Sequence, residues 1–274
     1  MGVITLITDF GTRDWFAATL HGVILGISPR AKVVDITHQI PPGDICSGAF
    51  ALRASYRYFP KGTVHVAVVD PGVGSPRRPL AVQTVNNLFV GPDNGLLSWA
   101  LAGERIKSIR QLENADFFLN PVSRTFHGRD IFAPVAAHLD RGAGMEQLGR
   151  ELDGFIRQEW PKPARQGEDV VGQVIYIDHF GNAITNIERE LVPQGASVCE
   201  VAGKRKARCR LAPFYGAVPV HRPVAVLGSS GLLEMAVNGG SIAQQFGVRI
   251  GDPVIVRRAK LQRQARTIRA PILD

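Results

Sequence analysis

The chain has 274 residues, 45% hydrophobic and 20% charged, a composition typical of globular proteins and a length that suits two packed units. Asp9 comes too early for a signal peptide, and no run of about 18 uncharged apolar residues follows, so we expect a cytoplasmic protein. Cys46, Cys199 and Cys209 form no CxxC pair, which favours reduced structural thiols and predicts neither a disulfide set nor a metal site.

The net charge of +8 raises the question of nucleic-acid binding, so the position of the charge matters. Residues 203–210 and 257–269 hold eleven of the 32 Lys and Arg residues, without interleaved aromatic residues. No helix-turn-helix, KH or RNP pattern accompanies them. A solvated basic edge and a basic C-terminal tail are therefore favoured over a nucleic-acid interface.

Strand and helix signals alternate through the first half of the chain. Short β-branched or apolar runs predict strands, and apolar residues at helical spacing predict helices. The strands are expected at residues 3–7, 32–36, 63–70, 80–85 and 88–93, and the helices at 14–29, 43–59, 94–103 and 129–143. This order predicts a doubly wound, mainly parallel α/β sheet with right-handed crossovers.

The composition changes at residues 157–169, where two prolines, several charges and a glycine form a break. We place the domain boundary there, with an α/β domain at 1–160, a linker at 161–170 and a second domain at 171–274. The second domain contains short β-rich runs separated by turn residues. This pattern predicts a smaller all-β barrel or sandwich.

Four carboxylates follow predicted strands, at Asp9, Asp35, Asp70 and Asp93. Since ligands of open α/β sheets bind beyond the carboxyl ends of the strands, an acidic rim is expected, although a cap or turn role is favoured for Asp35. The stretch "VDPGVGSPRR" at 69–78 is glycine-rich, but it lacks the G-x-x-x-x-G-K-[ST] pattern and begins beside a carboxylate. A neutral or cationic ligand therefore fits better than a phosphate.

His127 precedes the helix predicted at 129–143 and is flanked by Gly128. A histidine at this place can serve as a neutral hydrogen-bonding group, because the helix dipole opposes its protonation. The other six histidines have no H-x-x-x-H or H-E-x-x-H spacing, so the sequence predicts no metal cluster.

Six motifs occur in a fixed order along the chain. They are "TDFGTRD" (8–14), "VVDPGVGSPRR" (68–78), "FVGPDNGLL" (89–97), "FHGRD" (126–130), "IDHFGNAITNI" (177–187) and "GSSGLLEMAVNGGSIA" (228–243). With these motifs the chain resembles the S-adenosylmethionine (SAM) hydrolases, also called SAM hydroxide adenosyltransferases, which are relatives of the fluorinating and chlorinating SAM enzymes. The resemblance covers nearly the whole chain and implies an N-terminal α/β domain and a C-terminal β-barrel.

The resemblance implies an enzyme in which water or hydroxide attacks the 5′ carbon of SAM and releases adenosine and L-methionine. SAM is then the substrate, and no cofactor is expected. Members of the family are typically homotrimers, in which each site lies between the N-domain of one subunit and the C-domain of its neighbour.

The resemblance also implies the site residues. The catalytic set falls on Asp70, Arg77 and His127, where the seven-residue step from Asp70 selects Arg77 over Arg78. Asp9 corresponds to the acid that holds the ribose hydroxyls. The other substrate-binding residues that it implies are Asp14, Phe126, Asp178, Phe180, Asn182, Ser229, Glu234, Val237, Asn238 and Gly239.

Displacement at the 5′ carbon of a sulfonium releases a neutral thioether, so the leaving group needs no acid, and the enzyme mainly has to orient one water in a dry site. The hypothesis is that Asp70 orients this water and accepts its proton, that Arg77 fixes Asp70, and that His127 holds the water from a second side. An exchange of the roles of Arg77 and His127 is left open.

Three alternatives are left open. Halide-dependent adenosyl transfer is disfavoured because the halogenating relatives carry neutral side chains in place of Asp70 and His127, where a carboxylate would repel halide. The chain also has Gly128 and Ile184 where those enzymes place a serine and a tryptophan. A non-catalytic SAM or adenosine sensor is the second alternative, and a nucleic-acid-binding protein is the least favoured.

Overall fold

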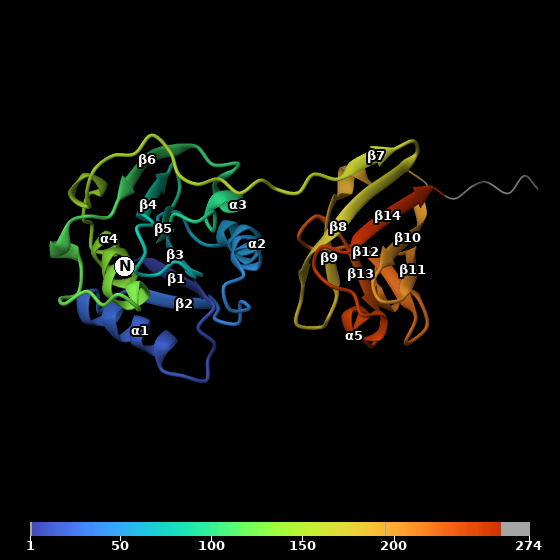
Figure 1. Ribbon diagram of the computed structural model, residues 1–274, viewed down its shortest axis with the longest axis horizontal. Helices are drawn as coiled ribbons and strands as arrows, with labels where there is room; N and C mark the ends of the chain where they lie inside the picture. The colour runs from blue at the N-terminus through green and yellow to red at the C-terminus, as the bar shows by residue number, and fades with distance from the viewer. Residues whose placement is uncertain (1, 195, 259–274) are drawn as a thin grey trace, which may run out of the picture. The chain divides into compact units, whose positions relative to one another are not determined.

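The computed structural model describes residues 2–194 and 196–258. The chain divides after Trp160 into two compact units, each with its own sheet (Figure 1). The segment 161–170, expected to be a linker, includes strand β7 (Ala164–Gln166) and the beginning of β8 (Asp169–Ile177). Most of the basic tail noted in the sequence, from residue 259 onward, lies outside the described residues.

The N-terminal unit is built on a six-stranded sheet of order β2-β1-β3-β5-β4-β6. Its strands are β1 (Val3–Thr8), β2 (Lys32–Thr37), β3 (Val64–Val68), β4 (Pro79–Thr84), β5 (Leu88–Pro92) and β6 (Ile106–Gln111). β2, β1, β3 and β5 are mutually parallel, β4 is antiparallel to both of its neighbours, and the edge strand β6 again has the direction of β5. The predicted mainly parallel sheet is confirmed, and β6 is an additional strand whose mixed polar sequence gave no strand signal.

Helices cover both faces of this sheet (Figure 1). They are α1 (Phe16–Ile27), α2 (Ile45–Ser55), α3 (Ser98–Leu101) and α4 (Ala133–Asp140). α1 and α4 bury their apolar residues against one face, and α2 and α3 against the other. Successive strand residues such as Val66 and Ala67 belong to opposite cores, as the two-residue period of a strand requires. No described helix is long and apolar enough to cross a membrane.

The parallel register brings the ends of β1 and β3 together, because Thr8 pairs with Val68. Asp9 and Asp70 therefore leave the sheet from adjacent strands. The expected rim of four carboxylates is wrong in part: Asp35 lies inside β2 rather than after it, and Asp93 is buried in an ion pair with Arg78. A buried, paired carboxylate has its charge already compensated, so Asp93 serves the fold.

The C-terminal unit is a closed seven-stranded barrel, which confirms the all-β expectation. The pairing of β8 with β14 closes the ring, and β7 pairs with the first residues of β8, Asp169–Val171. The remaining strands are β9 (Ala183–Glu188), β10 (Ala196–Ala202), β11 (Lys206–Leu211), β12 (Pro223–Leu227), β13 (Leu232–Val237) and β14 (Pro253–Arg258), with the short helix α5 (Ile242–Phe246) after β13.

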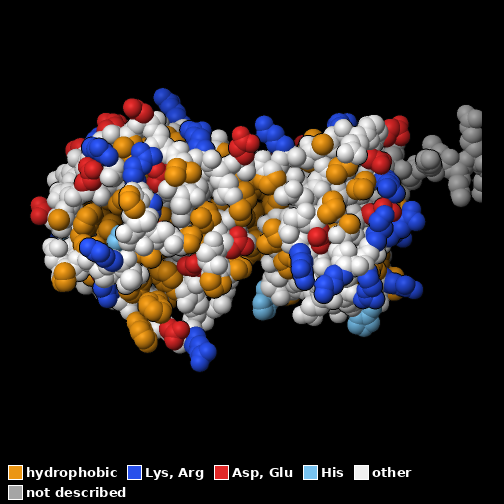
Figure 2. Space-filling model, in the orientation of Figure 1, with side chains coloured by type: hydrophobic (Ala, Val, Ile, Leu, Met, Phe, Trp, Pro, Cys, Tyr) orange, Lys and Arg blue, Asp and Glu red, His pale blue; other side chains and the backbone are white. Residues whose placement is uncertain are grey.

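The basic run at 203–210 lies on the solvent side of this barrel. In β11 the exposed Lys206, Arg208 and Arg210 alternate with buried Ala207 and Cys209. Lys206 and Arg208 both form ion pairs with Glu200 on the neighbouring strand β10, and Figure 2 shows Lys and Arg side chains grouped on this unit. The charge is partly neutralised on a solvated face, as expected for a basic edge.

Candidate active site

The turn after β3 brings Asp70 and Arg77 together across seven residues. No helix follows its glycines, so the stretch is not a phosphate loop. Gly74 has φ +77°, and a Cβ atom there would overlap the backbone carbonyl of Arg124. A glycine at this position therefore allows the turn to lie directly against the segment that leads to His127.

Asp70, Arg77 and His127 form one hydrogen-bonded network. The Nε atom of Arg77 donates to both carboxylate oxygens of Asp70, at 3.0 and 2.9 Å, and Nη2 also donates to Oδ2. The same Nη2 lies 2.7 Å from Nδ1 of His127. The side chains of Arg77 and Asp70 are only 9% and 6% exposed, so their mutual attraction is little screened by solvent.

The contact with Arg77 fixes the tautomer of His127. Since a guanidinium can only donate, Nδ1 of His127 accepts, and the proton of the neutral ring resides on Nε2. Burial, followed by the charge of Arg77, lowers the pKa of His127 from its usual 6.5, against the opposing effects of the charges of Asp70 and Asp130 and of the Ser123 backbone. His127 is therefore a neutral ring near pH 7, with its N–H on the side away from Arg77.

A π-helical turn over Gly128–Phe132 follows His127 and leads into α4. Such turns are rare and frequently mark functional sites. The buried carboxylate of Asp130 accepts from the backbone N–H of Ser123 at 2.8 Å and pairs with Arg129. This bond fixes the loop that precedes His127, so Asp130 positions the histidine indirectly.

Asp9 lies at the end of β1 beside this network. Its Oδ2 atom accepts from the backbone N–H of Gly43 at 2.8 Å, and a Cβ on Gly43 would lie 3.8 Å from Pro71, the residue after Asp70. Phe126 packs edge-on against Phe10, at 5.6 Å between ring centroids. Asp9, the turn after β3 and the segment around Phe126 are thus neighbours, whereas Asp14 is exposed in the loop before α1.

In the C-terminal unit, Asp178 and Asn182 together form the turn between β8 and β9. Oδ1 of Asp178 accepts from the backbone N–H of Asn182 at 2.8 Å, and Oδ2 accepts from its side-chain amide at 3.0 Å. Gly181 has φ +78°, as the tight turn requires. Phe180, at the tip of the turn, is 72% exposed.

Glu234 is buried in β13 of the same barrel. It accepts from the hydroxyl of Tyr215 at 2.5 Å, and its pKa is raised by burial, with a further contribution from the charge of Asp178. Asp178 and Glu234 are therefore electrostatic neighbours. Ser229 lies exposed in the turn that precedes β13.

The segment Val237–Gly239 ends β13. The side-chain amide of Asn238 donates to the backbone carbonyl of Val218 at 2.7 Å, and the backbone carbonyl of Asn238 accepts from the backbone N–H of His221 at 2.8 Å. Gly239 has φ +67°. The end of β13 is thus tied to the loop between β11 and β12, which carries Tyr215.

Sequence reasoning gave no role to three residues that position this machinery: Asn94, Asp130 and Tyr215. The side-chain amide of Asn94 donates to the carbonyl of Val69 at 2.8 Å and so fixes the backbone just before Asp70. Asn94 lies in the motif at 89–97 and Asp130 in the motif at 126–130, so their position in these motifs was the only indication in the sequence that they have a role. Tyr215 lies in a loop, and only the fold pairs it with Glu234.

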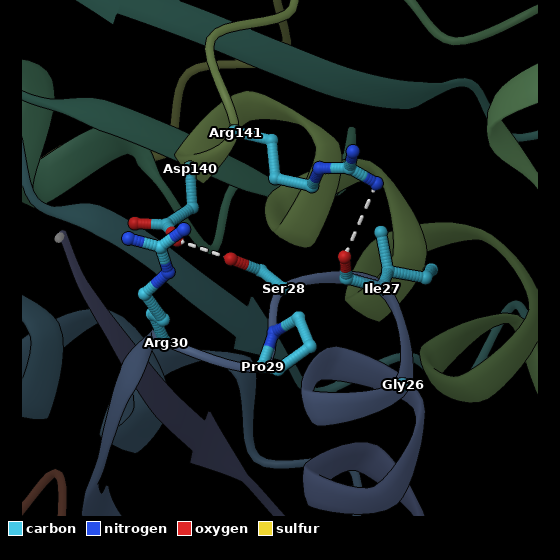
Figure 3. A pocket seen from close by; sticks show the side chains of 7 residues that line it. All are labelled: Gly26, Ile27, Ser28, Pro29, Arg30, Asp140 and Arg141. Atoms are coloured by element: carbon cyan, nitrogen blue, oxygen red, sulfur yellow. Dashed lines mark hydrogen bonds between the residues drawn. The ribbon is translucent and has the colours of Figure 1, made fainter.

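A separate surface pocket of about 570 Å³ lies where α1 and α4 end (Figure 3). The hydroxyl of Ser28 donates to Asp140 at 2.6 Å, and Arg141 donates to the carbonyl of Ile27 at 3.3 Å. None of the predicted site residues lines it. The network of Asp70, Arg77 and His127 therefore belongs to a different part of the unit.

Comparison with known proteins gives matches over most of the chain. The model of the SAM hydroxide adenosyltransferase N-terminal domain matches residues 4–149, and that of the C-terminal domain matches residues 172–255. The chain belongs to the SAM hydroxide adenosyltransferase family. The predicted family is thereby confirmed.

Within this family, the chain is 41% identical to the (R)-S-adenosyl-L-methionine hydrolase of Thermus thermophilus, over 93% of this chain and 99% of that protein. It is 40% identical to the protein of the same name from Salinispora arenicola, over 92% and 97%. A fluorinase from Nocardia brasiliensis is more distant, at 28% identity over 93% and 96%.

A solved structure of similar fold is described as an uncharacterized conserved protein from Thermotoga maritima. It has a TM-score of 0.86 and 35% sequence identity, and the match covers 93% of this chain and all of that one. The two-unit SAM hydroxide adenosyltransferase architecture therefore extends over nearly the full length of this protein.

Proposed function

We propose that this protein hydrolyses S-adenosyl-L-methionine to adenosine and L-methionine. The observation that carries the proposal is the Asp70–Arg77–His127 network, in which a buried Asp70–Arg77 pair offers a carboxylate acceptor beside the neutral, partly buried imidazole of His127. The family membership and the (R)-SAM hydrolases at about 40% identity support it. By the same reasoning, the (R) sulfonium epimer is the substrate.

Asp70 acts on the nucleophile in this mechanism. One water lies between the carboxylate of Asp70 and the 5′ carbon of SAM, in line with the bond to sulfur. As the new C–O bond forms and the C–S bond breaks, the water proton passes to Asp70, and methionine leaves as a neutral thioether. Proton transfer to a positioned base of this kind contributes about 10²–10⁴-fold to the rate.

Arg77 and His127 prepare the water for attack. Arg77 holds the carboxylate of Asp70 in one orientation through two nitrogen atoms, a geometry that a lysine cannot reproduce. The Nε2–H of His127 donates to the water oxygen and fixes its direction. Orientation of two reactants in a near-attack geometry can contribute about 7–11 kcal/mol to the lowering of the barrier.

The remaining predicted residues bind the substrate. Asp9 accepts from the ribose hydroxyls, and Phe126 and Asp14 belong to the same side of the ligand. From the barrel, Asp178, Phe180 and Asn182 contact the methionine and adenine ends. The segment that closes over the ligand contains Ser229, Glu234, Val237, Asn238 and Gly239.

The assembly and its surroundings are part of the proposal. The protein acts in the cytoplasm as a homotrimer, in which each site combines the N-terminal unit of one subunit with the C-terminal unit of its neighbour. It needs no cofactor, because the substrate itself carries the leaving group. Neither nucleic acid nor a membrane is a partner.

A product assay tests the reaction and the site together. The protein is incubated with SAM in heavy-oxygen water, and adenosine and methionine are separated by chromatography. We expect many turnovers, ¹⁸O in the 5′ hydroxyl of adenosine, and a loss of about 10³-fold in rate for Asp70→Ala. Asp116→Ala removes an exposed carboxylate of the same unit and serves as the matched control.

The same assay separates the alternatives. A halogenated nucleoside formed in the presence of chloride or fluoride would indicate halide-dependent transfer. Binding of SAM without turnover beyond one equivalent would indicate a sensor. Either outcome would overturn hydrolysis as the function.

A further inference from the structure

His21, Asp35 and His38 converge away from the catalytic network. His21 comes from α1, Asp35 from β2 and His38 from the loop that follows β2. Nε2 of His21 lies 2.7 Å from Oδ1 of Asp35, and Nε2 of His38 lies 3.0 Å from the same oxygen. The ligand atoms of all three side chains lie within 4.8 Å of one another.

We propose that His21, Asp35 and His38 bind a divalent transition-metal ion, with Zn²⁺ as the favoured ion. Two imidazoles and one carboxylate are a donor set that suits zinc, and three protein ligands leave a fourth position for water. Ligand atoms around a tetrahedral zinc with bonds of 2.0–2.1 Å lie about 3.3 Å apart. The two distances from Nε2 to Oδ1 of Asp35, 2.7 Å for His21 and 3.0 Å for His38, are close to this value and need to widen only slightly.

The burial and hydrogen bonding of His38 favour a metal-binding site over a cluster held together only by hydrogen bonds. Its side chain is only 4% exposed, and its Nε2 has no hydrogen-bond partner among the described residues, although Asp35 lies 3.0 Å away. Buried polar atoms are almost always bonded, so an unbonded one needs an explanation. A metal ion held between the three side chains satisfies this nitrogen.

The surroundings of His38 match those of a metal ligand. Its Nδ1 lies 2.8 Å from the hydroxyl of Thr8, which also accepts from the backbone N–H of Phe10 at 3.1 Å. Ligating histidines usually donate their second ring N–H to an oxygen, which directs the other nitrogen to the metal. Thr8 is the oxygen partner here, and it leaves Nε2 of His38 free for an ion.

The site is open to an ion from solution. The side chains of His21 and Asp35 are 30% and 43% exposed, whereas His38 forms the buried end. A bound ion would tie α1 to β2 and, through the bond of His38 to Thr8, to the end of β1 next to Asp9. The sequence did not predict the site because its ligands come from three elements without a metal-binding spacing.

Metal titration of the full-length, untagged protein tests the proposal. After treatment with a chelator, the protein is titrated with Zn²⁺ by calorimetry and with Co²⁺ by visible absorption. We expect one ion per chain, the absorption bands of four-coordinate Co²⁺, and a higher unfolding temperature with Zn²⁺. Absence of binding by the wild-type protein would overturn the site.

Variants at the exposed ligands locate the ion without removing the buried histidine. We expect His21→Ala and Asp35→Asn each to weaken Zn²⁺ binding at least about tenfold, as loss of one of three ligands requires. His179→Ala removes an exposed histidine of the barrel and should bind as the wild type does. Unchanged affinity in both ligand variants would place any bound ion elsewhere and contradict the proposal.

Discussion

Arg77 holds Asp70 through Nε and Nη2 in a pair that is almost completely buried. The same Nη2 reaches Nδ1 of His127, so one guanidinium orients both the acid and the imidazole. A point charge on a flexible stem cannot make this set of directed bonds.

Arg77→Lys should therefore damage catalysis while keeping the charge. We expect kcat to fall by about 10²-fold, because loss of the fork frees Asp70 and leaves Nδ1 of His127 without its donor. Steady-state kinetics with SAM measures the effect, and Arg78→Lys, at the neighbouring pair with Asp93, is the control for the fold. A kcat within twofold of wild type would show that Arg77 is not a positioning residue.

The pH profile should report the state of His127. Its pKa is lowered from 6.5 by burial and by Arg77, so the ring becomes protonated only below its usual range. If the neutral ring is required, kcat/KM stays level as the pH falls through 6.5 and declines only at lower pH. NMR titration of the imidazole, assigned with His127→Gln, measures the pKa directly. A value of 6.5 or higher would contradict the environment described.

Gly74 should be needed for activity although it carries no functional group. A side chain there would overlap the carbonyl of Arg124 and would have to adopt φ +77°. Gly74→Ala should therefore separate the turn after β3 from the segment before His127 and lower kcat by about 10-fold or more.

Gly62→Ala is the matched control for this variant. Gly62 has φ +85°, but its Cβ would meet no atom within 4 Å. It should lose stability from backbone strain and keep its kcat. Equal loss of kcat in both variants would mean that strain alone, and not the contact with Arg124, explains the effect of Gly74→Ala.

The sequence predicted the two architectures because their patterns are local. β-branched runs and helical spacing mark β1, α1 and β3, and regular turn residues mark the barrel strands. Strand direction is not local, so the reversed direction of β4, which is antiparallel to both β5 and β6, was not foreseen. β6 has few apolar residues and carries little strand signal of its own.

The sequence motifs indicated Asp70, Arg77 and His127, but only the hydrogen bonds between them in the folded chain show which atoms donate and which accept. The sequence left the roles of Arg77 and His127 exchangeable, whereas the bond to Nδ1 makes His127 an acceptor toward Arg77 and an N–H donor on its other side. Asp35 was expected after a strand and lies within one, because β2 continues to Thr37 past a bulge in its pairing with β1.

His65 should make the protein less stable in mild acid. It is fully buried beside Tyr56 and Phe89, and burial lowers its pKa to about 4. Since the unfolded chain binds a proton near pH 6.5, stability is complete above that pH and falls as the pH decreases toward 4. Between pH 7.5 and pH 5 the expected loss is about 2 kcal/mol.

Denaturant unfolding at the two pH values measures this loss. His65→Gln cannot titrate but can still bond to Thr5, the partner of Nδ1 in the wild type. We expect the variant to be less stable at pH 7.5 and to show a smaller difference between the two pH values. An equal pH dependence in both proteins would assign the acid sensitivity to other groups.

Mixed subunits should test whether one site draws on two chains. Asp70→Ala disables the N-terminal unit, and Phe180→Ala removes an exposed side chain of the barrel without disturbing its core. If each variant is inactive alone and each site of a homotrimer combines units from neighbouring subunits, random assembly of the two variants leaves about a quarter of the sites intact. Co-expression should then restore about that fraction of wild-type activity.

The matched control combines two variants of the same unit, Asp70→Ala and His127→Ala, where every site keeps a defect and no activity should return. If activity returns when Asp70→Ala is mixed with Phe180→Ala but not when it is mixed with His127→Ala, the turn that carries Phe180 completes the site of a different subunit. If neither mixture recovers while mixed trimers are present, each chain completes its own site, and the proposed sharing between subunits is wrong.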